Sequence, residues 1–133
     1  MEYALSNDSI SIKVSTAGGS FREYLWQGDP TVWSGQAPIC FPICGGLRDN
    51  SAMTFAGHHV KLARHGFARK QEWKLLSQGE NELAMCLASE DNAALLSDYP
   101  YPFRLVARYT LEDAAVRVSY EVTNKGTEDM PFF

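Results

Sequence analysis

Regular alternation of apolar and polar residues near the N-terminus constrains the fold most. Ile10, Ile12 and Val14 alternate with serine and lysine residues. A period of two is typical of a β-strand with one face in the core, because successive side chains point to opposite sides. The glycines at 18–19 interrupt the pattern, and residues 21–26 then favour a returning strand. The chain is therefore predicted to begin as an antiparallel sheet.

Similar strand patterns, separated by turn residues, recur along the rest of the chain. Residues 27–30 read Gln-Gly-Asp-Pro, which predicts a turn. One short helix is predicted over 92–97. The length of 133 residues is that of one domain, and the sequence predicts a single all-β domain over 1–133, an antiparallel β-sandwich. Its further hairpins are predicted at 53–62, between 71–77 and 82–89, and between 103–111 and 115–122 across Glu112 and Asp113.

Charge and hydropathy exclude two classes of partner. Sixteen acidic and twelve basic residues give a net charge of -4, whereas a nucleic-acid-binding protein needs a basic stripe that neutralises phosphates. Residues 37–44 form the longest apolar run, which two prolines interrupt and which is far shorter than the roughly 20 residues that cross a bilayer. No basic segment leads into an apolar run at the N-terminus, so we expect no secretory signal and a cytoplasmic location.

The three cysteines are expected to be reduced, because their number is odd and no export signal is visible. Cys40 and Cys44 are expected to pack as small apolar side chains, since free cysteine is among the most buried residue types. A zinc site needs three or four converging ligands, and no His, Cys or Asp set has a suitable spacing. His58 and His59 are adjacent and point to opposite faces of a strand. We therefore predict no metal site.

Two segments carry candidate chemistry. His65 stands in a glycine-containing turn between Arg64 and Arg69, where an imidazole that titrates near neutrality is suited to proton transfer. A structural or surface histidine is the alternative. Arg48 and Asp49 end a proline- and glycine-interrupted apolar stretch, a pattern that fits either the rim of a polyol or anion pocket or a solvated hairpin end.

Several of these motifs, in this order, resemble the aldose 1-epimerase (galactose mutarotase-like) family. The resemblance is nearest to its LacX-like branch, while hexose-6-phosphate epimerases share the His-Gly-Phe-Ala-Arg segment. It implies the family's fold, a large antiparallel β-sandwich called a supersandwich, of which this chain resembles the N-terminal half. The motifs that carry the resemblance are 26–30, Trp33, 38–45, 65–69, 101–103 and Asn124.

The resemblance also implies a chemistry. Family members interconvert the α and β anomers of a sugar by opening its ring, which needs an acid for the ring oxygen and a base for the anomeric hydroxyl. His65 matches the first of two active-site histidines, which contacts the substrate near the anomeric centre. The second histidine, in a Gly-x-His-Pro segment, and the carboxylate base would follow Phe133, so the chain alone is expected to be inactive. No cofactor is implied, because ring opening needs only proton transfers.

The resemblance further suggests substrate contacts at Arg48 and Arg69. The LacX-like pattern often has arginine where this chain has Gly46, and Arg48 two residues later would lie on the same face of a strand. For a hexose phosphate, Lys61 and Arg64 are further candidates for pairing with the phosphate. The alternative function is a non-catalytic carbohydrate-binding or structural β-sandwich. Half a sandwich would also expose strand edges, so self-association is expected.

Overall fold

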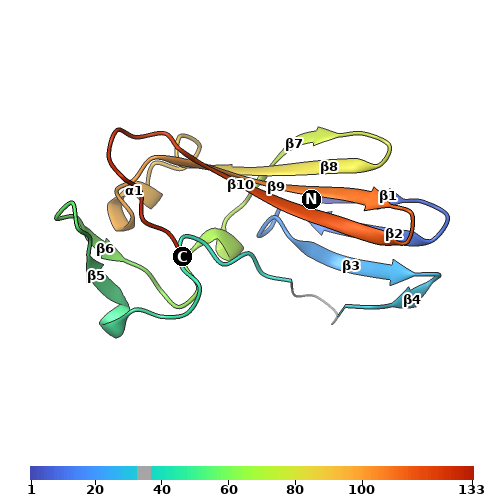
Figure 1. Ribbon diagram of the computed structural model, residues 1–133, viewed down its shortest axis with the longest axis horizontal. Coiled ribbons are helices and arrows are strands. Elements are labelled where there is room, and N and C mark those ends of the chain that lie inside the picture. The colour runs from blue at the N-terminus through green and yellow to red at the C-terminus, as the bar shows by residue number, and fades with distance from the viewer. Residues whose placement is uncertain (33–36) are drawn as a thin grey trace.

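Two four-stranded antiparallel sheets pack face to face in the computed structural model, which describes residues 1–32 and 37–133 (Figure 1). Trp33, one of the residues that carried the resemblance, lies outside the described residues. The first sheet has the order β1-β2-β3-β4. Its strands are β1 (Glu2–Ser6), β2 (Ile10–Ser15), β3 (Phe21–Trp26) and β4 (Asp29–Pro30).

The second sheet has the order β10-β9-β8-β7, and every neighbouring pair in it is antiparallel. A separate two-stranded hairpin, β5 (Ser51–Met53) and β6 (His59–Lys61), stands at one end of the sandwich (Figure 1). The one α-helix in the described residues is the four-residue α1 (Leu95–Asp98). The strands of the second sheet are β7 (Lys74–Gln78), β8 (Glu82–Ala88), β9 (Phe103–Glu112) and β10 (Ala115–Asn124).

The predicted all-β antiparallel sandwich is confirmed, with local differences. The helix predicted over 92–97 begins and ends later, as α1 (Leu95–Asp98), and the strand predicted over 71–77 begins later, as β7 (Lys74–Gln78). β1 was not predicted, because Leu5 is its one buried residue and leaves little apolar alternation. Asp29 and Pro30 belong to β4 and not to the turn, since Gln27 and Gly28 alone take positive φ angles of 50° and 88°. Two consecutive positive φ angles give the tight hairpin that matches strand twist. The β9–β10 turn likewise lies one residue later than predicted, because Glu112 pairs with Ala115.

The core lies between the two sheets. Ile12 and Val14 of β2 are fully buried, as the alternation predicted, and belong to one apolar cluster with Leu83 of β8 and Phe103 of β9. Trp73 is 1% exposed and donates its indole N–H to the Ala68 carbonyl at 2.9 Å. This bond satisfies the one polar group of the indole, which is the condition for burying it.

Tyr109 of β9 joins the two sheets by a polar contact within this core. Its hydroxyl donates to the Gly19 carbonyl at 2.6 Å, and its ring packs edge-on against Phe21 of β3. Burial, followed by the nearby Tyr120 hydroxyl, raises the pKa of Tyr109 above its usual value. The phenol therefore stays neutral and remains a hydrogen-bond donor throughout the ordinary pH range.

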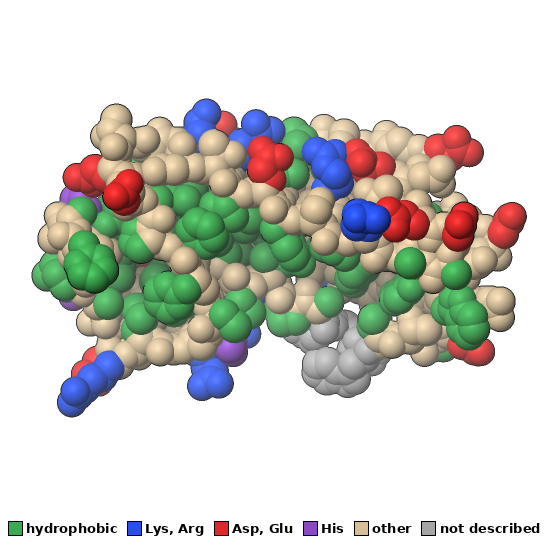
Figure 2. Space-filling model, viewed as in Figure 1, with side chains coloured by type: hydrophobic (Ala, Val, Ile, Leu, Met, Phe, Trp, Pro, Cys, Tyr) green, Lys and Arg blue, Asp and Glu red, His purple; other side chains and the backbone are tan. Residues whose placement is uncertain are grey.

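Large apolar side chains are exposed across the face that Figure 2 shows. Phe55 lies at the β5–β6 hairpin, and Phe132 and Phe133 lie at the C-terminus. β10 is an edge strand of ten residues in the described sheet. No helix among residues 1–32 and 37–133 is long and apolar enough to span a membrane.

We expect the 133-residue chain to self-associate, because exposed apolar side chains and an open strand edge both favour contact with another copy. Light scattering over a concentration series should show a mass that rises with concentration. Replacing Phe132 and Phe133 together by serine should reduce the association by removing exposed apolar area. A monodisperse monomer over the whole series would contradict this expectation.

Candidate functional site

Two segments that are distant in sequence run side by side and build the site. The backbone of Phe41 forms a parallel bridge with Gly66 and accepts a hydrogen bond from the Phe67 N–H at 3.0 Å. The His65 N–H donates to the Gly45 carbonyl at 2.6 Å. These bonds align residues 41–45 with residues 65–67, so the side chains that project from the two segments share one space.

The turn that carries His65 needs an unusual backbone. His65 and Gly66 both have a φ of 68°, in the left-handed region that residues with a Cβ atom rarely adopt. A Cβ atom on Gly66 would lie 2.2 Å from the Phe41 carbonyl oxygen. Glycine at position 66 therefore permits both the turn and the close approach of the neighbouring segment.

The His65 imidazole is oriented by the neighbouring backbone. The Gly45 N–H donates to its Nδ1 atom at 3.0 Å, and the Arg64 Nε–H approaches its Nε2 atom at 3.3 Å. A neutral imidazole has one lone-pair nitrogen, so only one of these contacts is a hydrogen bond in a given tautomer. We assign the acceptor to Nδ1, because the backbone amide is closer than the Arg64 side chain, which is exposed to solvent. The proton then resides on Nε2.

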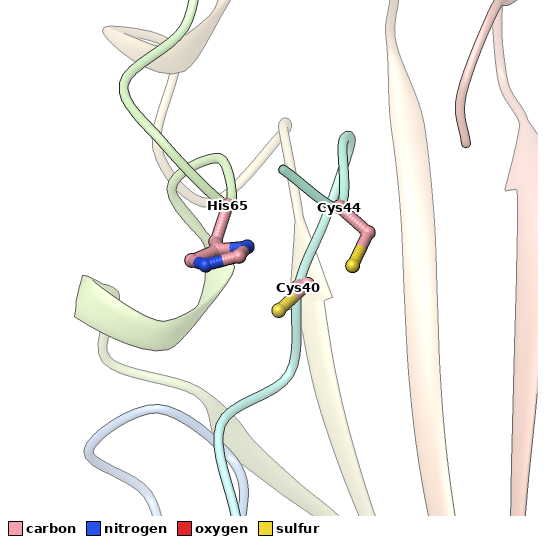
Figure 3. A group of neighbouring side chains, drawn as sticks. All are labelled: Cys40, Cys44 and His65. Atoms are coloured by element: carbon pink, nitrogen blue, oxygen red, sulfur yellow. The ribbon is translucent and has the colours of Figure 1, made fainter. Parts of the chain in front are cut away.

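Cys40 and Cys44 lie beside this ring (Figure 3). The expectation that they are buried is wrong, because Cys40 is half-buried and Cys44 is exposed, whereas Cys86 of β8 is buried. Partial burial and the neighbouring Cys44 thiol raise the pKa of Cys40, and the Arg69 guanidinium acts in the opposite direction. All three cysteines are free thiols. The irregular backbone of residues 37–47 is the physical reason, because without a strand there is no single inward face.

The expectation that no His and Cys set converges is also wrong. One donor atom each from Cys40, Cys44 and His65 lies within 4.8 Å of the others. Figure 3 shows the two sulfur atoms and the imidazole around a common space between the two segments. Sequence spacing did not reveal this cluster, because His65 is brought to the cysteines by the pairing of Phe41 with Gly66.

Arg69 is positioned next to the His65 turn. Its Nη2 atom donates to the Arg64 carbonyl at 3.0 Å. Its Nε atom is buried and has no hydrogen-bond partner in the part of the chain that the structure describes. The guanidinium therefore stabilises the His65 turn through the Arg64 carbonyl and places a positive charge near Cys40.

Arg48 is placed differently from the prediction. It does not lie on a strand, because residues Arg48–Asn50 form a 3₁₀ turn with φ angles of 54° at both Asp49 and Asn50. Its side chain is 97% exposed, and its Nε atom lies 4.0 Å from the Asp49 carboxylate. The argument from a shared strand face is therefore wrong, and the direction of Arg48 is set by the turn.

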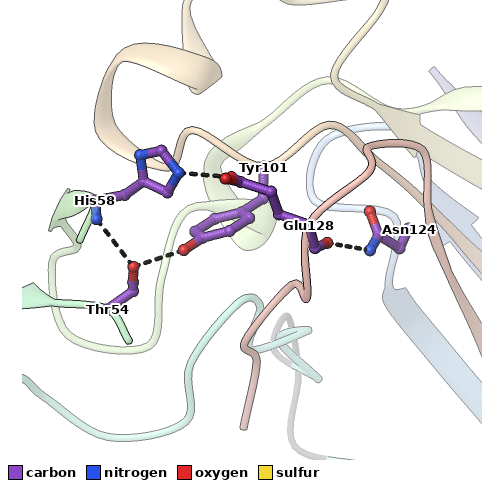
Figure 4. Close-up of polar contacts among 5 residues, drawn as sticks. All are labelled: Thr54, His58, Tyr101, Asn124 and Glu128. Carbon is purple, nitrogen blue, oxygen red and sulfur yellow. Dashed lines mark hydrogen bonds and ion pairs between the residues drawn. The ribbon is translucent and has the colours of Figure 1, made fainter. Parts of the chain in front are cut away.

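A second polar cluster, not foreseen from the sequence, fastens the β5–β6 hairpin to the main sandwich (Figure 4). The Tyr101 hydroxyl donates to Thr54 Oγ1 at 2.6 Å, and the His58 N–H donates to the same oxygen at 3.2 Å. The His58 Nε2 atom lies 2.6 Å from the Glu128 carboxylate. His59, the first residue of β6, is exposed. The contacts of this cluster link loops, so we assign it a structural role.

Surface hollows in the described residues lie near the His65 turn without including its ring. One is lined by residues on both sides of the turn, Ala63 and Gly66 among them, but not by His65. A second, strongly apolar one is lined by Ile43, Leu47 and Phe133. The substrate contact at His65 that the family resemblance implies therefore stays a prediction.

Comparison with known proteins identifies the class to which this sandwich and its histidine turn belong. The family described as aldose 1-epimerase matches residues 1–133, and the chain therefore belongs to that family. The LacX protein of Lactococcus lactis subsp. lactis is 39% identical over 149 residues, which cover 100% of this chain and 48% of LacX.

Solved structures agree with this assignment. A galactose mutarotase related enzyme from Lactobacillus acidophilus superimposes with a TM-score of 0.90 at 26% identity, covering 99% of this chain and 46% of that one. A protein from Synechocystis sp. PCC 6803 gives a TM-score of 0.87 at 31% identity, covering 99% of this chain and 51% of that one. The chain thus spans about half the length of the relatives it matches.

Proposed function

We propose that this chain is part of an aldose 1-epimerase that interconverts the anomers of a hexose or hexose phosphate by acid–base ring opening. The observation that carries the proposal is the His65 turn, in a chain that the family matches over residues 1–133. The Gly45 N–H at Nδ1 leaves the proton on Nε2, where it is available to a sugar oxygen.

Ring opening requires one proton to reach the ring oxygen and another to leave the anomeric hydroxyl. His65 contacts the sugar near the anomeric centre in this proposal, while the second histidine and the carboxylate base belong to the other half of the family's length. Arg69, beside the His65 turn, and Arg48, through its long exposed side chain, are the proposed substrate contacts. We propose a cytoplasmic location, where the three free cysteines stay reduced.

Anomer exchange is expected to need more than these 133 residues. The chain alone should leave the rate of α-glucose and α-galactose mutarotation, followed by polarimetry, equal to the buffer rate. The product of the complete reading frame should accelerate it, and His65→Gln in that protein should lower kcat by about 10²- to 10⁴-fold because proton transfer is lost. His59→Gln, at an exposed position of β6, is the matched control and should retain the activity.

Three outcomes would count against the proposal. Acceleration by the 133-residue chain that His65→Ala abolishes would show that the missing base is not required. Full activity of His65→Gln in the complete protein would remove His65 from the chemistry. Sugar binding by the complete protein without any acceleration would favour a carbohydrate-binding module instead.

A further inference from the structure

A thiol-rich cluster beside the His65 turn has a chemistry that anomer exchange does not use. Cys40, Cys44 and His65 each direct one donor atom into the same space, and the three atoms lie within 4.8 Å of one another. Soft and borderline metal ions bind thiolate and imidazole donors in preference to the oxygen atoms of carboxylates and water. Two thiols and an imidazole are therefore a suitable donor set for such an ion. Neither thiol is fully buried, so a cation from solvent has access to both.

We propose that Cys40, Cys44 and His65 form a binding site for a single Zn²⁺ ion. Zinc is commonly held by cysteine and histidine in tetrahedral geometry, and a site with three protein ligands leaves the fourth position to water. Zn–S bonds of about 2.3 Å and Zn–N bonds of about 2.0 Å place tetrahedral ligands about 3.5 to 3.8 Å apart. The three donor atoms, which lie within 4.8 Å of one another, therefore need to approach by about 1.3 Å at most.

The backbone around the cluster is already in place for such a site. The Phe41–Gly66 bridge and the bond from the His65 N–H to the Gly45 carbonyl hold the two ligand-bearing segments in register. Cys44 is exposed, so its side chain is free to make the small adjustment that tetrahedral geometry requires. Holding the ligands before the ion arrives lowers the entropy cost of binding.

Coordination changes one contact of the apo site. A neutral imidazole has a single lone-pair nitrogen, and in the structure that lone pair accepts the Gly45 N–H. Binding of His65 to zinc replaces this hydrogen bond, so the two thiolates supply most of the affinity. Zinc bound at Nδ1 leaves the imidazole proton on Nε2.

The test uses the 133-residue chain itself, freed of metal and kept reduced by a phosphine. Titration with Co²⁺ should give one ion per chain, with a sulfur-to-cobalt charge-transfer band and the intense visible bands of a tetrahedral ion, and Zn²⁺ should displace it. Cys40→Ser and Cys44→Ser should each weaken Zn²⁺ binding at least about tenfold, in line with the cost of losing groups that hold a metal. His65→Gln should keep the charge-transfer band and also bind more weakly.

Cys86→Ala is the control, because Cys86 lies in a separate buried cluster of the second sheet. It should bind Zn²⁺ like the unaltered chain. Circular dichroism of every variant establishes that the sandwich is intact, so that a loss of binding is read only from folded protein. Weak binding of Zn²⁺ that is equal in the unaltered chain and in the Cys40→Ser/Cys44→Ser double variant would overturn the proposal. An octahedral Co²⁺ spectrum without a charge-transfer band would overturn it as well.

Discussion

Gly66→Ala is expected to be among the most destabilising single substitutions in this protein. The new Cβ atom would lie 2.2 Å from the Phe41 carbonyl oxygen and 2.5 Å from its carbon, a distance that real Cβ atoms do not tolerate. Both atoms belong to the backbone, so a change of side-chain rotamer does not relieve the clash. Either the Phe41–Gly66 bridge opens or the turn changes its conformation, and both outcomes remove His65 and Cys40 from their shared space.

Gly57→Ala separates this clash from the cost of the backbone conformation. Gly57 has a similar positive φ of 82°, but a Cβ atom there meets nothing within 4 Å. It should lower the free energy of unfolding by about 1 to 2 kcal/mol, the cost of a side chain in the left-handed region. Gly66→Ala should lower the free energy of unfolding by about 3 kcal/mol more, because the closely packed backbone around the new Cβ atom is unable to move away without loss of contacts.

Urea unfolding followed by tryptophan fluorescence measures both variants in the same way. The midpoint should fall much further for Gly66→Ala than for Gly57→Ala, and failure of Gly66→Ala to fold is the extreme form of the same result. Equal midpoints for the two variants would show that the two segments do not approach each other as closely as the structure has them.

Phe103→Ala is expected to have the next largest effect. Phe103 is 0% exposed, and its ring centre lies 5.0 Å from that of Phe41 and 5.7 Å from that of Phe67. Truncation leaves a cavity under the segments that carry the site, and a buried phenylalanine replaced by alanine costs about 3 to 5 kcal/mol. That is a large share of the roughly 5 to 15 kcal/mol by which domains are stable.

Phe55→Ala removes the same atoms at a position that is 113% exposed, at the tip of the β5–β6 hairpin. It should change the free energy of unfolding by no more than about 0.5 kcal/mol, because the side chain is in water before and after unfolding. Urea midpoints with unchanged slopes would measure both effects. Similar losses for the two variants would mean that Phe103 is not packed between the sheets as described.

The strands were predictable because their signal is local. Ile10, Ile12 and Val14 alternate along β2, and burying one face of a strand needs nothing more than that period. β1 and the exact turn residues were missed for the same reason. Leu5 alone gives no period, and Asp and Pro are typical turn residues although Asp29 and Pro30 form β4. Local patterns thus predict elements better than their boundaries.

The pattern of residues also led to the right family. It could not place Arg48, because the left-handed conformations of Asp49 and Asn50 redirect the chain just after it. Nor could it place Cys44, whose apolar neighbours suggested burial in a segment that has no strand. Both errors arose from applying strand geometry where the backbone is irregular.

The amino-acid sequence alone therefore determined the strands and the family, since apolar periodicity and short motifs involve only residues that are near one another in the chain. The meeting of His65 with Cys40 and Cys44 was decided by folding, because it depends on a backbone bridge between segments far apart along the chain. Such a contact forms only when the surrounding core offsets the entropy of closing the intervening loop. A local sequence pattern does not show whether the core offsets this entropy, so the contact could not be predicted from the sequence.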